Sequence, residues 1–321
     1  MTHLKTILLA TLFTAAAACG SSDGTDTDSS GSDSSGSDSS GSDSSGSDSS
    51  GSDSSGTASV RDACRKLDII FSVDPSSSMA EEHQIMASTV FPAFAERLLD
   101  IGDGLDDYRV GVIDSCPLDT NFRTAGIDDN NNDAATQCNF EGGQPYMTSD
   151  SSRLVEEFSC VGDFDEDPAA CAAISSQDEQ PFRSVITAAN SPANDGFLRD
   201  DALLVVFALT DEDECPGGEG VDGCPGGQAV QDDLFNGLTA LKGGDPQKMV
   251  VVGMGASAPC VGGTIGDAGV AATDLHAVTQ RFVDIDKGVI WDICDQDPIE
   301  TAIDEAIAVI DQACRDFTPI E

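Results

Sequence analysis

The stretch Leu203–Leu209 constrains the fold more than any other part of this chain. Its residues, Leu-Leu-Val-Val-Phe-Ala-Leu, are all apolar, as expected for a β-strand that is buried on both faces. Strands of this kind occur in parallel sheets that carry helices on both sides. The valine-rich segment Lys248–Val252 has the same character. The two segments therefore predict the middle of a parallel sheet.

Short apolar runs alternate with longer helical patterns from Cys64 onward, which is typical of an α/β fold. We expect strands at Leu67–Val73, Arg109–Ile113, Ala202–Leu209, Lys248–Val252 and Gly288–Ile293. We expect helices at Met79–Leu99, Leu154–Phe158, Pro181–Ala189, Val230–Leu241, Val270–Phe282 and Ile299–Ala313. Pro92 should kink the first of these helices. Residues 64–321 are thus predicted to form one doubly wound α/β domain with a mainly parallel sheet.

The first 63 residues have a different character. Lys5, the apolar run Ile7–Phe13 and the small residues before Cys19 predict a signal peptide over residues 1–18, and the run is too short to span a bilayer. The sequence around Cys19 is similar to a bacterial lipobox, which implies lipidation of Cys19 and anchoring to an outer membrane, facing the periplasm or the cell surface. Ordinary secretion is the alternative. The unit Ser-Ser-Gly-Ser-Asp then repeats five times from Ser29 to Asp53, which predicts a disordered tether within residues 19–63.

The cysteine content indicates an oxidising compartment. Of the 11 cysteines, Cys19 is assigned to the lipid anchor, and an even number then remains for disulfides. Zinc binding is the alternative, but the sequence has no C-x-x-C pair, and the mature chain keeps only His83 and His276 as imidazole ligands. We therefore predict disulfides, with the pairing left open, among Cys64, Cys116, Cys138, Cys160, Cys171, Cys215, Cys224, Cys260, Cys294 and Cys314.

The charge of the chain excludes one class of partner. The formal net charge is -43, with 58 acidic residues against 15 lysines and arginines. Binding to nucleic acid depends on clustered basic residues, so we expect no nucleic-acid partner. Direct attraction to anionic lipid is excluded for the same reason, and membrane contact is expected through the lipid anchor only.

A candidate metal-binding loop follows the first predicted strand. Asp74, Ser76 and Ser78 alternate directly after it, and residues two apart in an extended loop point the same way. A carboxylate and two hydroxyls suit Mg²⁺, which prefers hard oxygen ligands. The loop would lie at the carboxyl end of a parallel strand, where open α/β sheets place their ligands. An alternative is that Ser78 and Glu81 form a capping box for the next helix.

These residues match the D-x-S-x-S motif of the metal-ion-dependent adhesion site, and the chain resembles von Willebrand factor type A domains. Asp211, at the end of the strand that includes Leu203–Leu209, resembles the second acidic residue of that site. The resemblance implies a divalent cation, magnesium with calcium or manganese as alternatives. It also implies a protein partner whose acidic side chain completes the coordination of the cation.

The resemblance is incomplete between these two segments. The family places a threonine there, and here the corresponding loop is Ser175–Pro181, in which Ser176 or Glu179 could supply an oxygen. Ser77 replaces the glycine that is common in the first motif. Element order matches from Asp68 to the end of the chain, and Gly196–Arg199 resembles secreted, cysteine-containing type A domain proteins of myxobacteria and related bacteria.

We expect an envelope lipoprotein that binds a partner and has no enzymatic activity. One alternative is a structural envelope protein whose metal ion only stabilises the fold. The other is a hydrolase, for which His83 and His276 would be the candidate bases. We interpret His83 as a polar surface residue and Trp291 as a core residue. The acidic stretches Asp128–Asp133 and Asp163–Asp167 are interpreted as solvated insertions, with weak calcium binding as the alternative.

Overall fold

The computed structural model describes residues 65–98, 101, 105, 107–116, 121–126, 136–164, 179–214, 226–261, 270–295 and 299–317. All of them belong to one compact unit, Gly56–Glu321. The predicted signal peptide, Cys19 and the serine-rich repeat lie outside the described residues. Among the described helices, none has the length and apolar character needed to cross a bilayer.

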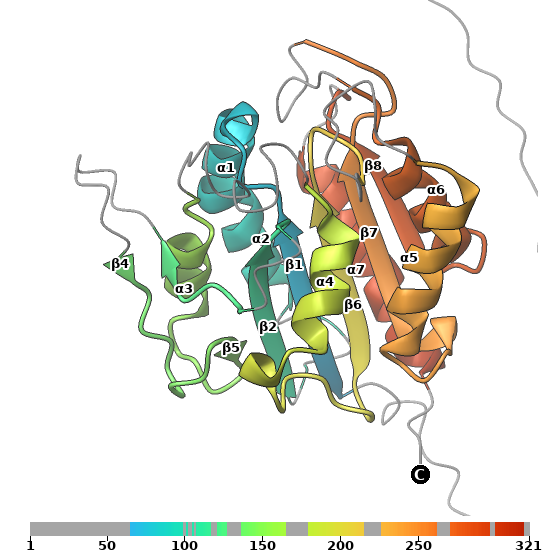
Figure 1. Cartoon of the computed structure of the whole chain (residues 1–321). Coiled ribbons are helices and arrows are strands. Elements are labelled where there is room, and N and C mark those ends of the chain that lie inside the picture. The colour runs from blue at the N-terminus through green and yellow to red at the C-terminus, as the bar shows by residue number, and fades with distance from the viewer. Residues whose placement is uncertain are drawn as a thin grey trace, which may run out of the picture. The chain divides into compact units, whose positions relative to one another are not determined.

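The fold is built on a sheet of six strands in the order β5-β2-β1-β6-β7-β8 (Figure 1). Its parallel strands are β1 (Lys66–Val73), β2 (Asp107–Asp114), β6 (Leu203–Leu209), β7 (Met249–Gly255) and β8 (Gly288–Asp292). These confirm the five strands predicted from the sequence. The antiparallel edge strand β5 (Met147–Thr148) and a separate pair, β3 (Ala125–Gly126) and β4 (Thr136–Gln137), were not predicted. Two-residue strands are too short to produce an alternating pattern.

Helices cover both faces of the sheet (Figure 1). One face carries α2 (Phe91–Leu98), α3 (Leu154–Val161) and α7 (Ile299–Asp316). The other carries α4 (Pro181–Ala189), α5 (Gln228–Ala240) and α6 (Thr273–Val283). The first predicted helix consists of α1 (Ala80–Ile85), a π-helical turn (Met86–Val90) and α2, so its irregularity directly precedes Pro92. Short 3-10 turns lie at Ser77–Met79, Pro192–Asn194 and Pro246–Lys248.

Side chains of the central strands alternate between two cores. In β1, Ile69 and Phe71 contact the core under α2 and α3, whereas Ile70 contacts the core under α4. Phe71 stacks on Phe207 of β6 with ring centroids 4.4 Å apart. Fully burying each large apolar side chain stabilises the fold by about 1.5–3 kcal/mol. Trp291 is buried in the first core, as predicted.

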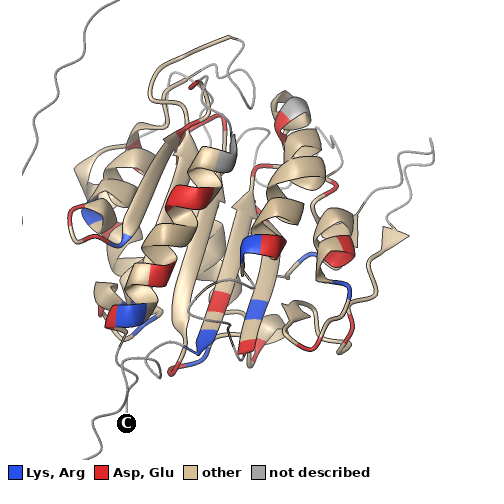
Figure 2. Cartoon of the chain, turned by 180° about the vertical axis from the view of Figure 1, so that it is seen from behind, with Lys and Arg blue, Asp and Glu red and all other residues tan. Residues whose placement is uncertain are grey.

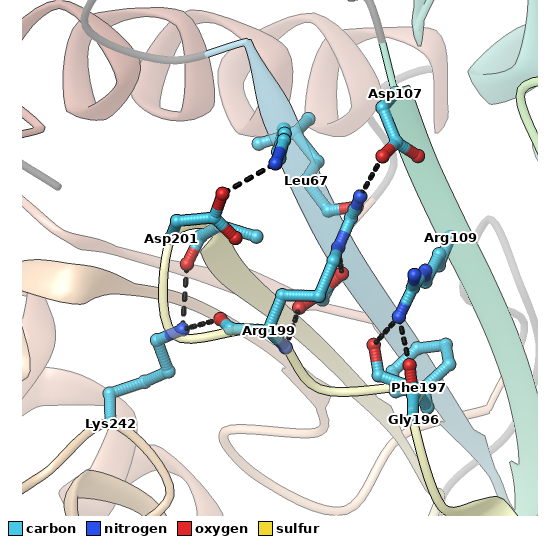
Figure 3. A network of polar contacts seen from close by, with 11 residues as sticks. Leu67, Asp107, Arg109, Gly196, Phe197, Arg199, Asp201 and Lys242 are labelled. Carbon is cyan, nitrogen blue, oxygen red and sulfur yellow. Dashed lines mark hydrogen bonds and ion pairs between the residues drawn. The ribbon is translucent and has the colours of Figure 1, made fainter. Parts of the chain in front are cut away.

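A polar network closes the end of the sheet where β1 and β2 begin (Figure 3). Arg199 donates from Nε to the buried carboxylate of Asp68 at 2.8 Å and from Nη2 to the carbonyl of Leu67 at 2.9 Å. It also forms an ion pair with Asp107. Lys242 donates to the carbonyl of Arg199 at 2.6 Å. The segment 196–199, which the sequence analysis singled out, therefore ties the start of two strands together.

Disulfides stabilise the domain, as the even cysteine count predicted. Cys138 pairs with Cys160, and Cys260 pairs with Cys294. Cys116 and Cys314 are also disulfide-bonded. The remaining cysteines, Cys64, Cys171, Cys215 and Cys224, lie outside the described residues.

Candidate metal centre

The order of the strands brings Asp74 and Asp211 together. β1 and β6 are neighbours in the sheet, and their register pairs Val73 with Leu209, the last residue of each strand. The backbone N–H of Asp74 continues the ladder by donating to the carbonyl of Leu209 at 3.0 Å. Because the strands are parallel, both loops leave the sheet at the same edge. Two residues that are far apart in the sequence thus face one site.

The carboxylate of Asp74 is fully buried and held on both sides. Its Oδ1 accepts a hydrogen bond from the backbone N–H of Ser76 at 2.8 Å. Its Oδ2 accepts one from the hydroxyl of Thr210 at 2.7 Å. The Thr210 hydroxyl in turn accepts from the N–H of Glu212 at 3.0 Å. Thr210 therefore links the loop after β6 to the aspartate after β1.

The two motif serines contact each other, and one of them contacts Asp211. The hydroxyls of Ser76 and Ser78 are 2.8 Å apart, and the Ser78 side chain hydrogen-bonds to the Asp211 carboxylate. In the structure α1 begins at Ala80 with Met79 as its N-cap residue, and Ser78 lies in the 3-10 turn before it. Asp211 Oδ1 is buried and makes no hydrogen bond among the described residues.

Glu179 enters the same site from the loop before α4. Its side chain interacts electrostatically with Asp74 and hydrogen-bonds to that of Glu212, and it is only 5% exposed. Its Oε2 is buried and has no hydrogen-bond partner in the described part of the chain. The neighbouring N–H of Gln180 donates to the carbonyl of Ser115 at 2.8 Å. Ser176, the other residue considered for this role, lies outside the described residues.

The described residues of the site are strongly acidic. Burial raises the pKa of Asp74, although the hydrogen bond from Thr210 counteracts this. Burial, followed by the charge of Asp74, raises the pKa of Asp211 to about 7 and that of Glu179 to about 9. Within the described residues, none of these three carboxylates forms an ion pair with lysine or arginine. In Figure 2 the charged residues coloured at the end of the sheet toward which the strands point are red, that is, acidic.

The next two acids of the run after β6 have a different role. Asp213 accepts hydrogen bonds from the N–H groups of Asp274 and Leu275, at the start of α6. Glu214 accepts from the N–H of Phe182, at the start of α4. Carboxylates at these positions satisfy N–H groups that have no partner within their helix. Asp213 and Glu214 thus fix α6 and α4 relative to the site.

The interpretation of His83 as a surface residue was wrong. The side chain is only 4% exposed, and its Nε2 lies 2.5 Å from the carbonyl oxygen of Asp74. Its ring stacks on Phe164 with centroids 5.1 Å apart. The contact holds the first motif in place from the side of α1. His276 makes a similar contact, with Nε2 at 3.1 Å from the carbonyl oxygen of Gly255.

The side chains present suit a hard divalent cation. One carboxylate oxygen each of Asp211 and Glu179 is buried and has no hydrogen-bond partner among the described residues, so these two oxygens are available as ligands alongside the hydroxyls of Ser76 and Ser78. In the described part of the chain, however, no three His, Cys, Asp or Glu side chains already stand in position to hold one ion. A cation here would therefore need the hydroxyl ligands or a rotation of the carboxylates.

Two residues of the site were not predicted from the sequence. Thr210 binds Asp74, and Glu212 interacts with both Glu179 and Asp211. Both residues flank Asp211 in the sequence. This position next to a predicted site residue was the only signal in the sequence that could have indicated them. A run of four acids does not reveal which side chains face the site and which cap helices.

Comparisons with known proteins assign no family to the chain. No protein-family model matches it, and no curated protein matches it. Similar solved structures include two of proximal thread matrix protein 1 from the mussel byssus. One, in crystal form 2, has a TM-score of 0.41 at 14% identity and covers 77% of this chain and 49% of that chain. The other has a TM-score of 0.36 at 14% identity, with 78% and 47% covered. This chain thus spans about half the length of those proteins, and a likeness at this level carries no argument about function.

Proposed function

We propose that the chain is a lipid-anchored envelope protein with a von Willebrand factor type A-like domain that binds a protein partner through a divalent cation. Asp74, Ser76, Ser78 and Asp211 would hold the ion, with Glu179 beside them. The ion would supply a positive charge that attracts an acidic side chain of the partner. The observation that carries the proposal is that buried carboxylates from the ends of β1 and β6 and from the loop before α4 interact with one another, and that no lysine or arginine among the described residues pairs with them.

The residues of the site would act in distinct ways. Asp211 and the two serines present oxygen atoms to the ion. Asp74 is oriented by Thr210 and by the backbone of its own loop, so its carboxylate is held in place before the ion arrives. Burial of the cluster excludes water, which strengthens the attraction between a cation and the carboxylates.

Calorimetric titration of the purified full-length protein with Mg²⁺, Mn²⁺ or Ca²⁺ tests the metal site. We expect saturable binding that is lost in Asp74→Asn and Asp211→Asn. Asp304→Asn is the matched control, because that aspartate is exposed on α7 and pairs with Arg97 on the surface. Absence of binding by the native protein with all three ions would refute the proposal.

Capture of proteins from envelope extracts tests the second part of the proposal. Immobilised native protein should retain a partner that is released by a chelator and is not retained by Asp74→Asn. The alternative is a structural protein whose ion only stabilises the fold, and it predicts stabilisation without metal-dependent capture. Ion at 100 times its Kd would raise the free energy of unfolding by about 2.7 kcal/mol in either case, so the capture experiment decides between them.

A further inference from the structure

One edge of the central sheet is open to a further strand. In the described sheet, β8 pairs only with β7 and forms the outer edge (Figure 1). The opposite edge is the two-residue strand β5, which is too short to receive another strand. β8 contains no lysine or proline, and its register with β7 has no bulge. Proteins commonly use these three features to protect a sheet edge, so the edge of β8 is unprotected.

The backbone groups of Ile290 point outward along this edge. In a parallel pair, every second residue of a strand bonds to the neighbouring strand. The carbonyl of Lys287 accepts from the N–H of Val251 at 3.0 Å, and the N–H of Ile293 donates to the carbonyl of Gly255 at 3.3 Å. The odd-numbered residues from 287 to 293 therefore face β7. The N–H and C=O of Ile290 face away from the sheet, and no backbone hydrogen bond found among the described loops and turns uses them.

A cavity of about 460 Å³ lies against residues 288–290 of β8. Its lining includes Val283 from α6, and Glu305 and Val309 from α7. These two helices cover opposite faces of the sheet, so the cavity extends across the edge of β8. Val283, Ile290 and Val309 are only partly buried. We call this cavity the β8 groove.

The shape of the β8 groove fits an extended peptide. The backbone of such a peptide would bond to the N–H and C=O of Ile290, and its side chains would alternate between the two faces of the sheet. On one face they would meet Val283, and on the other Val309. A peptide bound in this way gains affinity from its backbone and specificity from its side chains.

The charges around the β8 groove favour a basic peptide. Glu305 is exposed, and none of the described residues that line the groove is basic. A lysine or arginine of the peptide would be attracted by Glu305 and by the net charge of the chain, which is -43. A second copy of this chain would instead bring another Glu305 and another strongly negative domain to the same edge. Repulsion therefore disfavours pairing between two copies.

We propose that the β8 groove binds an extended, basic peptide segment of a partner protein, which adds to the sheet as a further strand between α6 and α7. The inference does not depend on the metal ion, because none of the described residues of the candidate metal centre lines the groove. The edge of β8 would thus be a second interaction surface of the domain.

A short synthetic peptide that alternates valine with lysine is the probe. Trp291, the only tryptophan of the chain, is next to Ile290 in β8, so its fluorescence reports binding at this edge. We expect a saturable change of fluorescence with the full-length protein at physiological ionic strength. The same peptide methylated at every backbone nitrogen is the control. It keeps the charge and the side chains but has no donors for strand pairing, so it should cause no change.

Charge reversal on α7 separates the β8 groove from general attraction to an acidic protein. Glu305→Lys should weaken binding of the peptide about fivefold, because it replaces an attraction with a repulsion. Asp304→Lys is the matched control. It makes the same change of charge on the same helix, but Asp304 pairs with Arg97 and does not line the groove. Its effect on binding should be less than about twofold.

Amide hydrogen exchange measured by NMR tests the strand pairing itself. In the complex the N–H of Ile290 should exchange at least about tenfold more slowly, whereas that of Val289, which already faces β7, should change little. The proposal is overturned by any of four results: no saturable binding, equal binding of the methylated peptide, equal weakening by the two lysine variants, or unchanged exchange at Ile290 in the complex. Slowing at Ile290 that depends on protein concentration alone would make a second copy the occupant and would also overturn it.

Discussion

Replacing Arg199 with methionine should destabilise the domain strongly, because the substitution leaves a buried carboxylate without its charged partner. Asp68 has no exposed surface, and Arg199 Nε donates to it at 2.8 Å. Removing one member of a buried ion pair costs about 3–5 kcal/mol. The backbone N–H of residue 199 also binds Asp68, at 2.7 Å, and the charge of Lys242 favours its ionised form. Both remain in the variant, so we expect the lower end, about 3 kcal/mol.

Urea unfolding at pH 7, followed by circular dichroism, measures this cost. A loss of about 3 kcal/mol corresponds to a fall in Tm of roughly 6–12 °C for a domain of this size. Arg97→Met is the control, because Arg97 and Asp304 form an exposed pair, with side chains 48% and 58% accessible. Exposed pairs contribute about 0–1 kcal/mol. Equal costs for the two arginine variants would refute the reasoning.

The partner residue gives an independent check. Asp68→Asn should cost less in the Arg199→Met background than in the native protein, because the uncompensated charge is then gone. Burial raises the pKa of Asp68, and loss of Arg199 should raise it further. The folded variant then keeps a proton at pH values where the native protein has released it, so the cost of Arg199→Met should grow as pH rises above the pKa of Asp68 in the native fold, which already lies above the ordinary value for aspartate. Additive costs at all pH values would contradict the pairing.

Three further predictions follow from other contacts. Thr210→Val removes the hydroxyl that binds Asp74 Oδ2, and should weaken metal affinity about fivefold, for roughly 1 kcal/mol lost, in calorimetric titration. Burial raises the pKa of Glu214 to about 8, so the folded state holds a proton that the unfolded chain loses above its ordinary pKa of 4.5. The free energy of unfolding of the native protein therefore falls as pH rises from that value toward 8. Over the same range Glu214→Gln should gain in stability relative to the native protein, as measured by urea titrations. Replacing Cys260 and Cys294, which are 34 residues apart, with serine should lower the free energy of unfolding by about 3–4 kcal/mol, measured by thermal denaturation against the intact protein.

Much of the fold could be predicted from the chain because local patterns decide it. The run Leu203–Leu209 has no polar side chain, so it fits only a strand covered on both sides, and it is fully buried in β6. Helical spacing located α4 and α7 for a similar reason, since one face of each helix must be apolar. The strands β3, β4 and β5 were not predicted, because each has two residues and is too short to show an alternation of apolar and polar side chains.

For the candidate site, the sequence determined the chemistry and the tertiary structure decided the geometry. Asp74, Ser76 and Ser78 could be identified because alternation after a buried strand is a local feature. That Asp211 lies beside them depends on the pairing of β1 with β6, and the position of Glu179 depends on the hydrogen bond that the next residue, Gln180, donates to the carbonyl of Ser115. Strand order is set by how all the helices and strands pack together. No local pattern in the sequence encodes it, and for the same reason neither the burial of His83 nor the pairing of Asp68 with Arg199 could be predicted.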